Sequence, residues 1–384
     1  MAKLHFSEDE LAGRRTRAAE RMAARGLDAV LLFKQESMFY LTGYDTTGYS
    51  LFQCMILLAD GSTVLVTRSA DREQAYHTSV IPDVRIWVDR GGANPAHDVV
   101  AVLEEKGIRG GRVGVEMHAW CLTAQRWKLV EGALEGFAAH EDATDLIQGL
   151  RLIKSPAELE YVRKAGALAD AALQALHEAI EPGVDEGHLY AVMTNALFEG
   201  GGDYPASRGI IGSGEGALLV RYFTGREKVG AQDQVQLEFG AAYRHYHACI
   251  MRTVLTGVAG DRHKQMHAGG IEALAACQAV ARPGNTYADI YEAHARVIDA
   301  HGLKDCRLNA CGYSLSANMP PSWMEEPMIY PGNMTVIEPG MVIFMHMILI
   351  DATNRLTMSY GETGIVHPDR FERVSSMSWD LVVK

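Results

Sequence analysis

In the first 150 residues, segments whose apolar residues have helical spacing alternate with short, continuously apolar runs. Ser7 and Glu10 have the spacing of a capping box, which predicts a helix that ends at Gly26. The apolar run at 28–33 predicts a buried strand. The other predicted elements are a hairpin over 53–60 and 62–68 with Asp60-Gly61 in a type I′ turn, a strand at 86–89, a helix over 96–107, a strand in VGVEM and a helix near 121–133. This succession predicts an α/β domain over residues 1–150.

A second domain is predicted for residues 151–384. Ser155, Pro156 and Glu158 have the residue types of N-cap, N1 and N3 of a long helix, and its apolar stripe continues to Pro182-Gly183. Further helices are predicted over 185–199, 262–281 and 286–302, and long strands over 234–257, 340–351 and 355–367. Helices packed on a curved, mainly antiparallel sheet make this an α+β domain.

Composition narrows the functions that the chain can have. Its 384 residues carry a formal net charge of −12 without any cluster of Lys and Arg, which argues against nucleic acid as a partner. No apolar run is as long as a membrane span, and the N-terminal residues lack the apolar segment of a secretory signal. The six cysteines show no CxxC or zinc-finger spacing, so we expect reduced thiols in a cytoplasmic protein that does not contact membranes.

The predicted strands of the second domain carry polar side chains within apolar sequence. They are Glu238, His245, His247 and Cys249 on the first strand, His346 on the second and Glu362 on the third, with Tyr313 on a connection. If the first strand is regular, residues 245, 247 and 249 share one face. Buried polar groups are costly unless they are paired, so these residues either satisfy one another or take part in chemistry.

Short motifs of the second domain point to a known family. IKSPAELEYVRKA, ARPGNTYADI and IEPGMVIF resemble segments of the pita-bread fold of creatinases and Xaa-Pro peptidases, and the resemblance covers nearly the whole chain. GGDYPA, YRHYH and GYSLSANMPPSW are most similar to the ectoine hydrolases within that family. The resemblance implies an α/β creatinase-type N-terminal domain, an α+β pita-bread catalytic domain and a homodimer to which residues 42–50 contribute across the interface.

Metallopeptidases with this fold bind two metals through two Asp, one His and two Glu. By motif, the first Asp falls on Glu238, and the second, eleven residues on and just before Arg-Thr, falls on Cys249. The His falls on Tyr313, the Glu after Pro-Gly-Met falls on His346, and the last Glu falls on Glu362. Two carboxylates are too few to hold two hard cations, so we expect no metal and no other cofactor.

The resemblance to creatinases and ectoine hydrolases implies a metal-independent hydrolase with a small-molecule substrate. The bond cleaved would be a C–N bond of a zwitterionic nitrogen metabolite of the amidine, guanidine or amide type. Glu238 is expected to attack the carbon or to activate the attacking water, and Glu362 to complete a carboxylate pair with separated pKa values. His346 is expected to move protons because histidine titrates near neutral pH.

Four more residues are predicted to bind the substrate. Arg221 falls at the place of the catalytic histidine of creatinases, a departure from that family, and a guanidinium there is expected to hold a substrate carboxylate. Tyr313 and His247 are expected to supply directional hydrogen bonds, and Cys249 to line the site as a small side chain.

Other interpretations stay open at this point. On the same scaffold the chain could be an Xaa-Pro metallopeptidase with a degenerate site, a lyase or a non-catalytic binding protein. The alternatives for single residues are a buried ion pair of Glu238 with Arg252 or Arg244, a satisfied core histidine at position 346, and one soft metal held by His245, His247 and Cys249.

Overall fold

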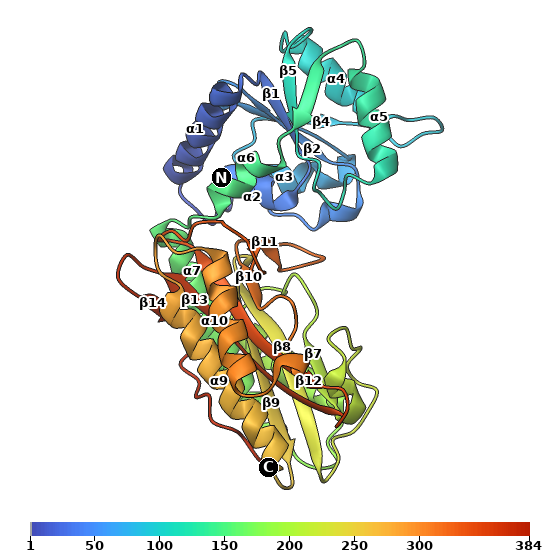
Figure 1. The fold of residues 1–384 in the computed structure, drawn as a ribbon. Helices are drawn as coiled ribbons and strands as arrows, with labels where there is room; N and C mark the ends of the chain where they lie inside the picture. The colour runs from blue at the N-terminus through green and yellow to red at the C-terminus, as the bar shows by residue number, and fades with distance from the viewer. Residues whose placement is uncertain (1) are drawn as a thin grey trace. The chain divides into compact units, whose positions relative to one another are not determined.

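A computed structural model describes residues 2–384, which divide into two compact units, residues 2–151 and 152–384. The first unit, coloured blue to green in Figure 1, is built on a sheet. This sheet has six strands in the order β4-β3-β2-β1-β5-β6. Its strands are β1 (Ala29–Leu32), β2 (Cys54–Leu58), β3 (Thr63–Thr67), β4 (Asp83–Ile86), β5 (Arg112–Val115) and β6 (Ala139–Asp142). Its α-helices are α1 (Glu8–Arg25), α2 (Gln35–Thr42), α3 (Arg72–Thr78), α4 (Pro95–Glu105), α5 (Ala124–Leu134) and α6 (Thr144–Arg151).

The start and end of α1 follow the predicted signals. The Ser7 hydroxyl accepts a hydrogen bond from the Glu10 N–H, and Gly26 ends the helix with a φ of 65°. The β2–β3 hairpin is also present, but the prediction of a type I′ turn was wrong. That turn needs a positive φ at both central residues, and of Asp60 and Gly61 only Gly61 has one.

The second unit is built on an eight-stranded sheet with the order β11-β10-β12-β13-β9-β8-β7, and β14 pairs with β13. Its strands are β7 (Ile210–Ser213), β8 (Asp233–Tyr243), β9 (Tyr246–Thr256), β10 (Gly312–Ser314), β11 (Glu325–Met328), β12 (Val342–Asp351), β13 (Leu356–Val366) and β14 (Phe371–Arg373). Its α-helices are α7 (Pro156–Ala179), α8 (Glu186–Glu199), α9 (Asp261–Val280) and α10 (Tyr287–Ala300).

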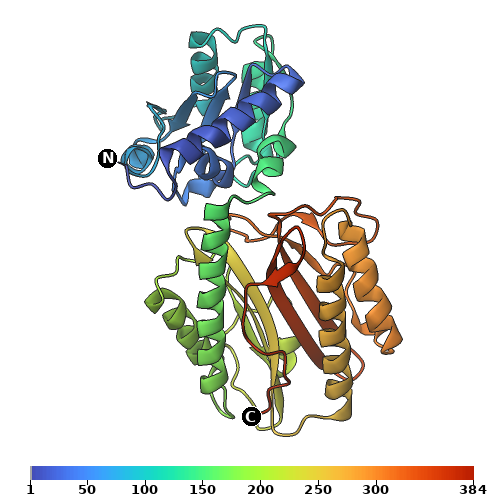
Figure 2. The same cartoon turned by 90° about the vertical axis from the view of Figure 1, so that its left-hand side faces the viewer.

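Helices α7 and α9 lie along the same face of this sheet (Figure 2). Ser155 and Glu158 form the predicted capping box at the start of α7, whose apolar stripe packs with Ile250 and Val254 of β9. Helix α9 packs with Met358 and other apolar residues of β12 and β13. Because the helices cover one face, the side chains of the opposite face are the ones left to form a site.

The predicted strand over 234–257 is in fact the hairpin of β8 and β9. Arg244 and His245 connect the two strands, with φ values of 51° and 66°. Positive φ at both central residues is the geometry of a type I′ turn, and its twist matches that of paired strands. His245 therefore lies in a turn, and the expectation that residues 245, 247 and 249 share one strand face was wrong.

Two further observations concern the whole chain. All six cysteines are free and buried. None of the helices within residues 2–384 has the length and apolar character needed to cross a bilayer.

Candidate active site

One row of residues crosses four neighbouring strands of the second sheet. Glu238 of β8 lies opposite Met251 of β9. Met251 in turn lies opposite Gly361 of β13, and Gly361 lies opposite His346 of β12. Directly opposed residues of antiparallel strands point to the same side of a sheet. We call this side the site face; Ile250, the neighbour of Met251, points to the other side and packs with α7.

Three more of the predicted residues lie on the site face. Cys249 and His247 come two and four residues before Met251 on β9, and alternate residues of a strand share a face. Tyr313 of β10 lies opposite Phe344, which comes two residues before His346 on β12. The site face therefore carries five of the seven predicted residues, namely Glu238, His247, Cys249, Tyr313 and His346.

The Glu238 carboxylate is half-buried and makes no hydrogen bond or ion pair with any residue in the range 2–384. Burial raises its pKa from 4.5 to about 7, and the positive charge of Arg221 opposes that rise. The arginines considered as partners of Glu238 pair elsewhere: Arg252 with Glu362, and Arg244 Nη1 with Asp203 Oδ1 at 3.1 Å. A carboxylate that has no structural partner and titrates near neutral pH suits acid–base or nucleophilic chemistry.

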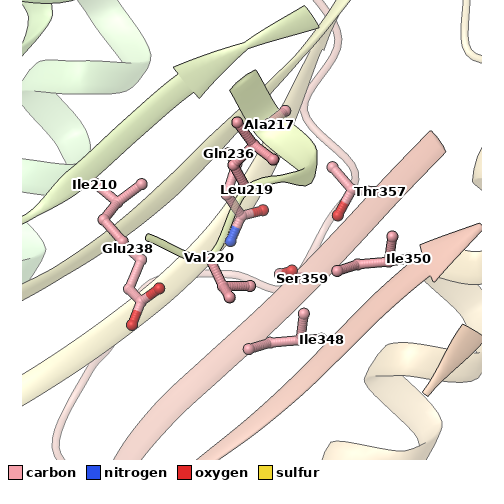
Figure 3. Close-up of a pocket in the computed structure, with 10 residues that line it drawn as sticks. All are labelled: Ile210, Ala217, Leu219, Val220, Gln236, Glu238, Ile348, Ile350, Thr357 and Ser359. Atoms are coloured by element: carbon pink, nitrogen blue, oxygen red, sulfur yellow. The ribbon is translucent and has the colours of Figure 1, made fainter. Parts of the chain in front are cut away.

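A narrow hollow opens beside Glu238 (Figure 3). Glu238 and Gln236 reach into it from β8, and Ile348 of β12 lies across from them. Aliphatic side chains form most of the remaining wall, and they include Ile210, Leu219, Val220 and Ile350. Glu238 is the only ionisable residue of this wall, so its charge state decides which ligands the hollow accepts.

Glu362 does not join Glu238, and the predicted carboxylate pair is not formed. Glu362 follows Gly361 on β13 and lies opposite Ile250, so it points to the helix-covered face. Its Oε1 atom accepts hydrogen bonds from three donors, which are Arg252 Nη2, Arg373 Nη2 at 3.3 Å and Trp379 Nε1 at 2.9 Å. The residue of β13 on the site face is Gly361. The expected catalytic role of Glu362 is therefore corrected to a structural one.

His346 lies on the site face but does not have the expected acidity. Burial, together with the positive charge of His294, lowers the pKa of His346 to about 3. The ring is therefore neutral at neutral pH, and the expectation that it titrates there was wrong. The ring centroid lies 5.8 Å from that of Tyr313. Its Nδ1 atom is buried without a hydrogen-bond partner in the described part of the chain.

Cys249 and Tyr313 lie within electrostatic reach of Glu238. Burial raises the pKa of the Cys249 thiol, and the negative charge of Glu238 adds to the effect. Burial also raises the pKa of Tyr313, with further contributions from Cys249 and Glu238. Both groups therefore stay protonated, which disfavours Cys249 as a thiolate nucleophile and keeps Tyr313 as a hydrogen-bond donor.

His247 has one ring nitrogen engaged. Its Nε2 atom accepts a hydrogen bond from the Ala206 N–H at 2.9 Å, so Nδ1 carries the proton. Burial lowers the pKa of His247 to about 3, which keeps the ring neutral. Since Nε2 is engaged and His245 lies in the hairpin turn, the alternative of a soft metal held by His245, His247 and Cys249 is not supported.

Arg221 lies at the exposed edge of the hollow. Its Nη1 atom donates to the Val220 carbonyl at 2.9 Å, and Val220 itself lines the hollow. Its positive charge lowers the pKa values of both Glu238 and Tyr313. The guanidinium makes no ion pair within residues 2–384, so it can receive an anionic group of a ligand.

The sequence-based selection missed Trp323. Its Nε1 atom donates to the Tyr313 hydroxyl at 2.9 Å, and a Cβ atom placed on Gly240 would lie 3.1 Å from its Cε3 atom. Trp323 thus contacts both β8 and β10, which are far apart in the strand order. The only available signal was its place in GYSLSANMPPSW, because irregular segments have no periodicity that assigns a side chain to a face.

Known families match both units. Residues 160–371 match metallopeptidase family M24, and residues 14–153 match the creatinase/prolidase N-terminal domain. The chain therefore belongs to metallopeptidase family M24, with a creatinase-type N-terminal domain and a C-terminal pita-bread domain. The fold and the family expected from the sequence motifs are confirmed, and membership assigns the chain to a family of hydrolases.

Individual relatives differ in what they act on. The chain is 31% identical over 355 residues to ectoine hydrolase from Halomonas elongata, which covers 88% of each protein. It is 26% identical over 360 residues to creatinase from a Bacillus species, covering 90% of this chain and 85% of that protein. The solved structure of dipeptidase PepE from Mycobacterium ulcerans has a TM-score of 0.86 over 98% of this chain and 99% of that one, at 23% identity, which is a likeness of fold.

The site face does not offer the ligands that a pair of metal ions needs. Glu238 is the one carboxylate of β8, β9, β12 and β13 that points to it. At the corresponding place on β13, Gly361 has no side chain, and a Cβ atom there would lie 2.6 Å from Cζ of Phe344. Nowhere in residues 2–384 do three His, Cys, Asp or Glu side chains group as metal ligands would. The residues therefore do not fit the paired metals of this family.

Proposed function

We propose that the chain is a metal-independent hydrolase that cleaves a C–N bond in a small zwitterionic nitrogen metabolite of the amidine, guanidine or amide type. The observation that carries this proposal is Glu238, a carboxylate without a structural partner and with a pKa of about 7, set in an otherwise non-ionisable wall. The likeness to ectoine hydrolase and creatinase supports a non-peptide substrate.

Glu238 can serve both halves of the hydrolysis. In its ionised form it takes a proton from a water molecule as the water oxygen bonds to the electrophilic carbon. The C–N bond then breaks, and the protonated carboxyl group returns the same proton to the leaving nitrogen. A pKa near the working pH favours such a dual role, because both protonation states are accessible.

Binding groups around Glu238 suit a zwitterion. The ionised carboxylate attracts a cationic or polarised C–N group, while Arg221 at the edge of the hollow can pair with a substrate carboxylate. Ile348 and Ile350 add an aliphatic surface to the wall that carries Glu238, which suits an apolar part of a ligand. The same proposal includes a homodimer in the cytoplasm with this small molecule as its ligand.

The test is a screen of the purified chain against ectoine, 5-hydroxyectoine, creatine, related cyclic amidines and Xaa-Pro dipeptides. Each compound is assayed after EDTA treatment and after addition of Mn²⁺, Co²⁺ or Zn²⁺. We expect turnover of a non-peptide compound at the same rate in all conditions. Turnover of dipeptides that EDTA abolishes would instead make the chain a metallopeptidase, and binding of a compound without turnover would make it a binding protein.

Removing the charge of Arg221 is expected to move the acid side of the pH profile. Arg221 holds the Glu238 pKa below the value that burial alone would give. In the Arg221→Gln variant the Glu238 pKa rises further, so the limb along which kcat/KM increases with pH shifts to higher pH. Arg226→Gln is the matched control, because Arg226 belongs to the same segment and does not affect the Glu238 pKa. A shift to lower pH would contradict the ionised carboxylate as the active form.

A further inference from the structure

We propose that Trp323 is a positioning residue that aims the Tyr313 hydroxyl group as a hydrogen-bond donor toward the reacting group of the substrate. The inference rests on the proposed hydrolase function and adds to it, for a substrate of the amide type, the group that stabilises the negative charge developing on the carbonyl oxygen. Trp323 and Tyr313 are both only 4% exposed, and neither belongs to the wall of the hollow described above.

The direction of the phenolic hydrogen follows from hydrogen-bonding capacity. An indole N–H can only donate, so in the 2.9 Å contact the Tyr313 oxygen is the acceptor. The phenolic hydrogen must then point away from Trp323. Within residues 2–384 it has no acceptor, although a buried hydroxyl normally has one. In the proposed complex, an acceptor atom of the substrate receives this hydrogen bond.

Tyr313 faces the groups proposed to carry out the reaction. The charges of Cys249 and Glu238 raise the pKa of its hydroxyl and the charge of Arg221 lowers it, so all three side chains lie within electrostatic reach. Burial keeps the phenol neutral, and a neutral phenol donates one hydrogen bond. A donor held in a site that excludes water stabilises an oxyanion more strongly than water does. The hydrogen bond that Trp323 donates to the phenol oxygen also polarises the phenolic O–H. This polarisation strengthens the hydrogen bond that the phenol donates in turn.

Trp323 is itself held rigidly. Its six-membered ring packs on Gly240, where a Cβ atom would lie 3.1 Å from Cε3 of Trp323 and 3.2 Å from Sγ of Cys249. The segment before it is tied to the β8–β9 hairpin by the hydrogen bond from the Asn318 N–H to the His245 carbonyl, at 3.0 Å. Anchored in this way on the strand that carries Glu238, the indole fixes Tyr313 relative to Glu238.

The hydrogen bond can be tested without a substrate. The chain contains five tryptophans, so a ¹⁵N–¹H correlation spectrum contains five indole N–H signals. Trp323→Phe assigns one of them by its loss, and Tyr313→Phe is expected to move that signal upfield and to leave the other four in place. Trp379→Phe assigns the control, since the Trp379 N–H donates at the same distance of 2.9 Å to Glu362 on the other face. A Trp323 signal that Tyr313→Phe does not move would overturn the inference.

The positioning role is tested by kinetics on the compound that the wild-type chain hydrolyses. We expect Tyr313→Phe to lower kcat by about 100-fold, and Trp323→Phe by roughly tenfold with KM unchanged. The double variant should be no slower than Tyr313→Phe, because Trp323 acts through the hydroxyl. Trp379→Phe should keep the wild-type kcat. Additive losses in the double variant, or a Trp323→Phe variant as active as wild type, would overturn the role, whereas a wild-type chain that hydrolyses nothing would count against the proposed function alone.

Discussion

Replacing Glu238 with glutamine is expected to abolish turnover and to make the protein more stable at pH 8. The amide can neither accept a proton from water nor attack the substrate carbon, so the loss should be on the order of 100- to 10,000-fold, the usual contribution of a positioned acid–base group. Its size and shape match those of the carboxyl group, so the half-buried position and its apolar surroundings are kept.

The gain in stability follows from the sign of the pKa shift. The Glu238 pKa is about 7 in the folded chain, against 4.5 for an exposed glutamate. Between these pH values the folded chain holds a proton that the unfolded chain has released, so the free energy of unfolding falls as pH rises. At about 1.4 kcal/mol for each pKa unit, the loss amounts to at most ~3.5 kcal/mol by pH 8. Glutamine has no charge to bury, so the variant avoids this loss of stability.

Thermal melting of both proteins at pH 4 and pH 8 measures this effect. We expect the melting temperature of Glu238→Gln relative to wild type to rise between the two pH values. Glu215→Gln serves as the control, because Glu215 is exposed and pairs with Arg355 at the surface, so its loss should change neither turnover nor the pH dependence of stability. A fully active Glu238→Gln variant would refute the role of this residue.

The helix ends and the family could be predicted from the sequence because short local motifs indicate both. Ser155 and Glu158 determine the start of α7 through hydrogen bonds that span only three residues. The hairpin turn at Arg244 and His245 was not recognised, since neither residue is a glycine or asparagine, the usual residues at positive φ. Burial was equally invisible, and it is burial that lowers the pKa of His346 to about 3.

The assignment of Glu362 failed for a reason specific to β13. A strand with one exposed face alternates between apolar and polar residues, and this alternation shows which residues share a face. From Thr357 to Val366 every residue of β13 is buried, so the strand offers no such alternation. Motif spacing alone then assigned a catalytic role to Glu362, and spacing does not show to which face of the strand a residue points. Only the pairing of Gly361 with Met251 settles the register.

The role of Trp323 could not be predicted from the sequence for a different reason. The residue matters because the chain after β10 returns across the site face to Gly240, about 80 positions earlier in the sequence. No local pattern encodes a contact between segments so far apart, and hydrophobic periodicity assigns faces only within helices and strands. Residues of this kind become visible once the strand order and the register are known.

The buried pair of Arg252 and Glu362 should be the most sensitive ion pair of the second unit to removal of one partner. Glu362 is fully buried, and Arg252 is 2% exposed. Arg252→Met leaves the Glu362 carboxylate without its main counterion. Glu362→Gln likewise leaves the Arg252 guanidinium without its counterion. Either change should lower the free energy of unfolding by about 3–5 kcal/mol, because a buried charge without a partner is costly. Chemical denaturation followed by near-UV circular dichroism measures the loss.

Two comparisons separate this structural role from the catalytic one that motif spacing assigned to Glu362. Replacing both partners, as Arg252→Met with Glu362→Leu, should restore part of the lost stability, since no uncompensated charge is then buried. Glu104→Gln, which breaks the exposed pair with Arg109, should cost less than about 1 kcal/mol. If Glu362→Gln instead left stability unchanged and abolished turnover below the melting temperature, the carboxylate would have to reach the site face. The strand register places Gly361 there, so we expect the folded Glu362→Gln protein to keep its turnover and to lose stability.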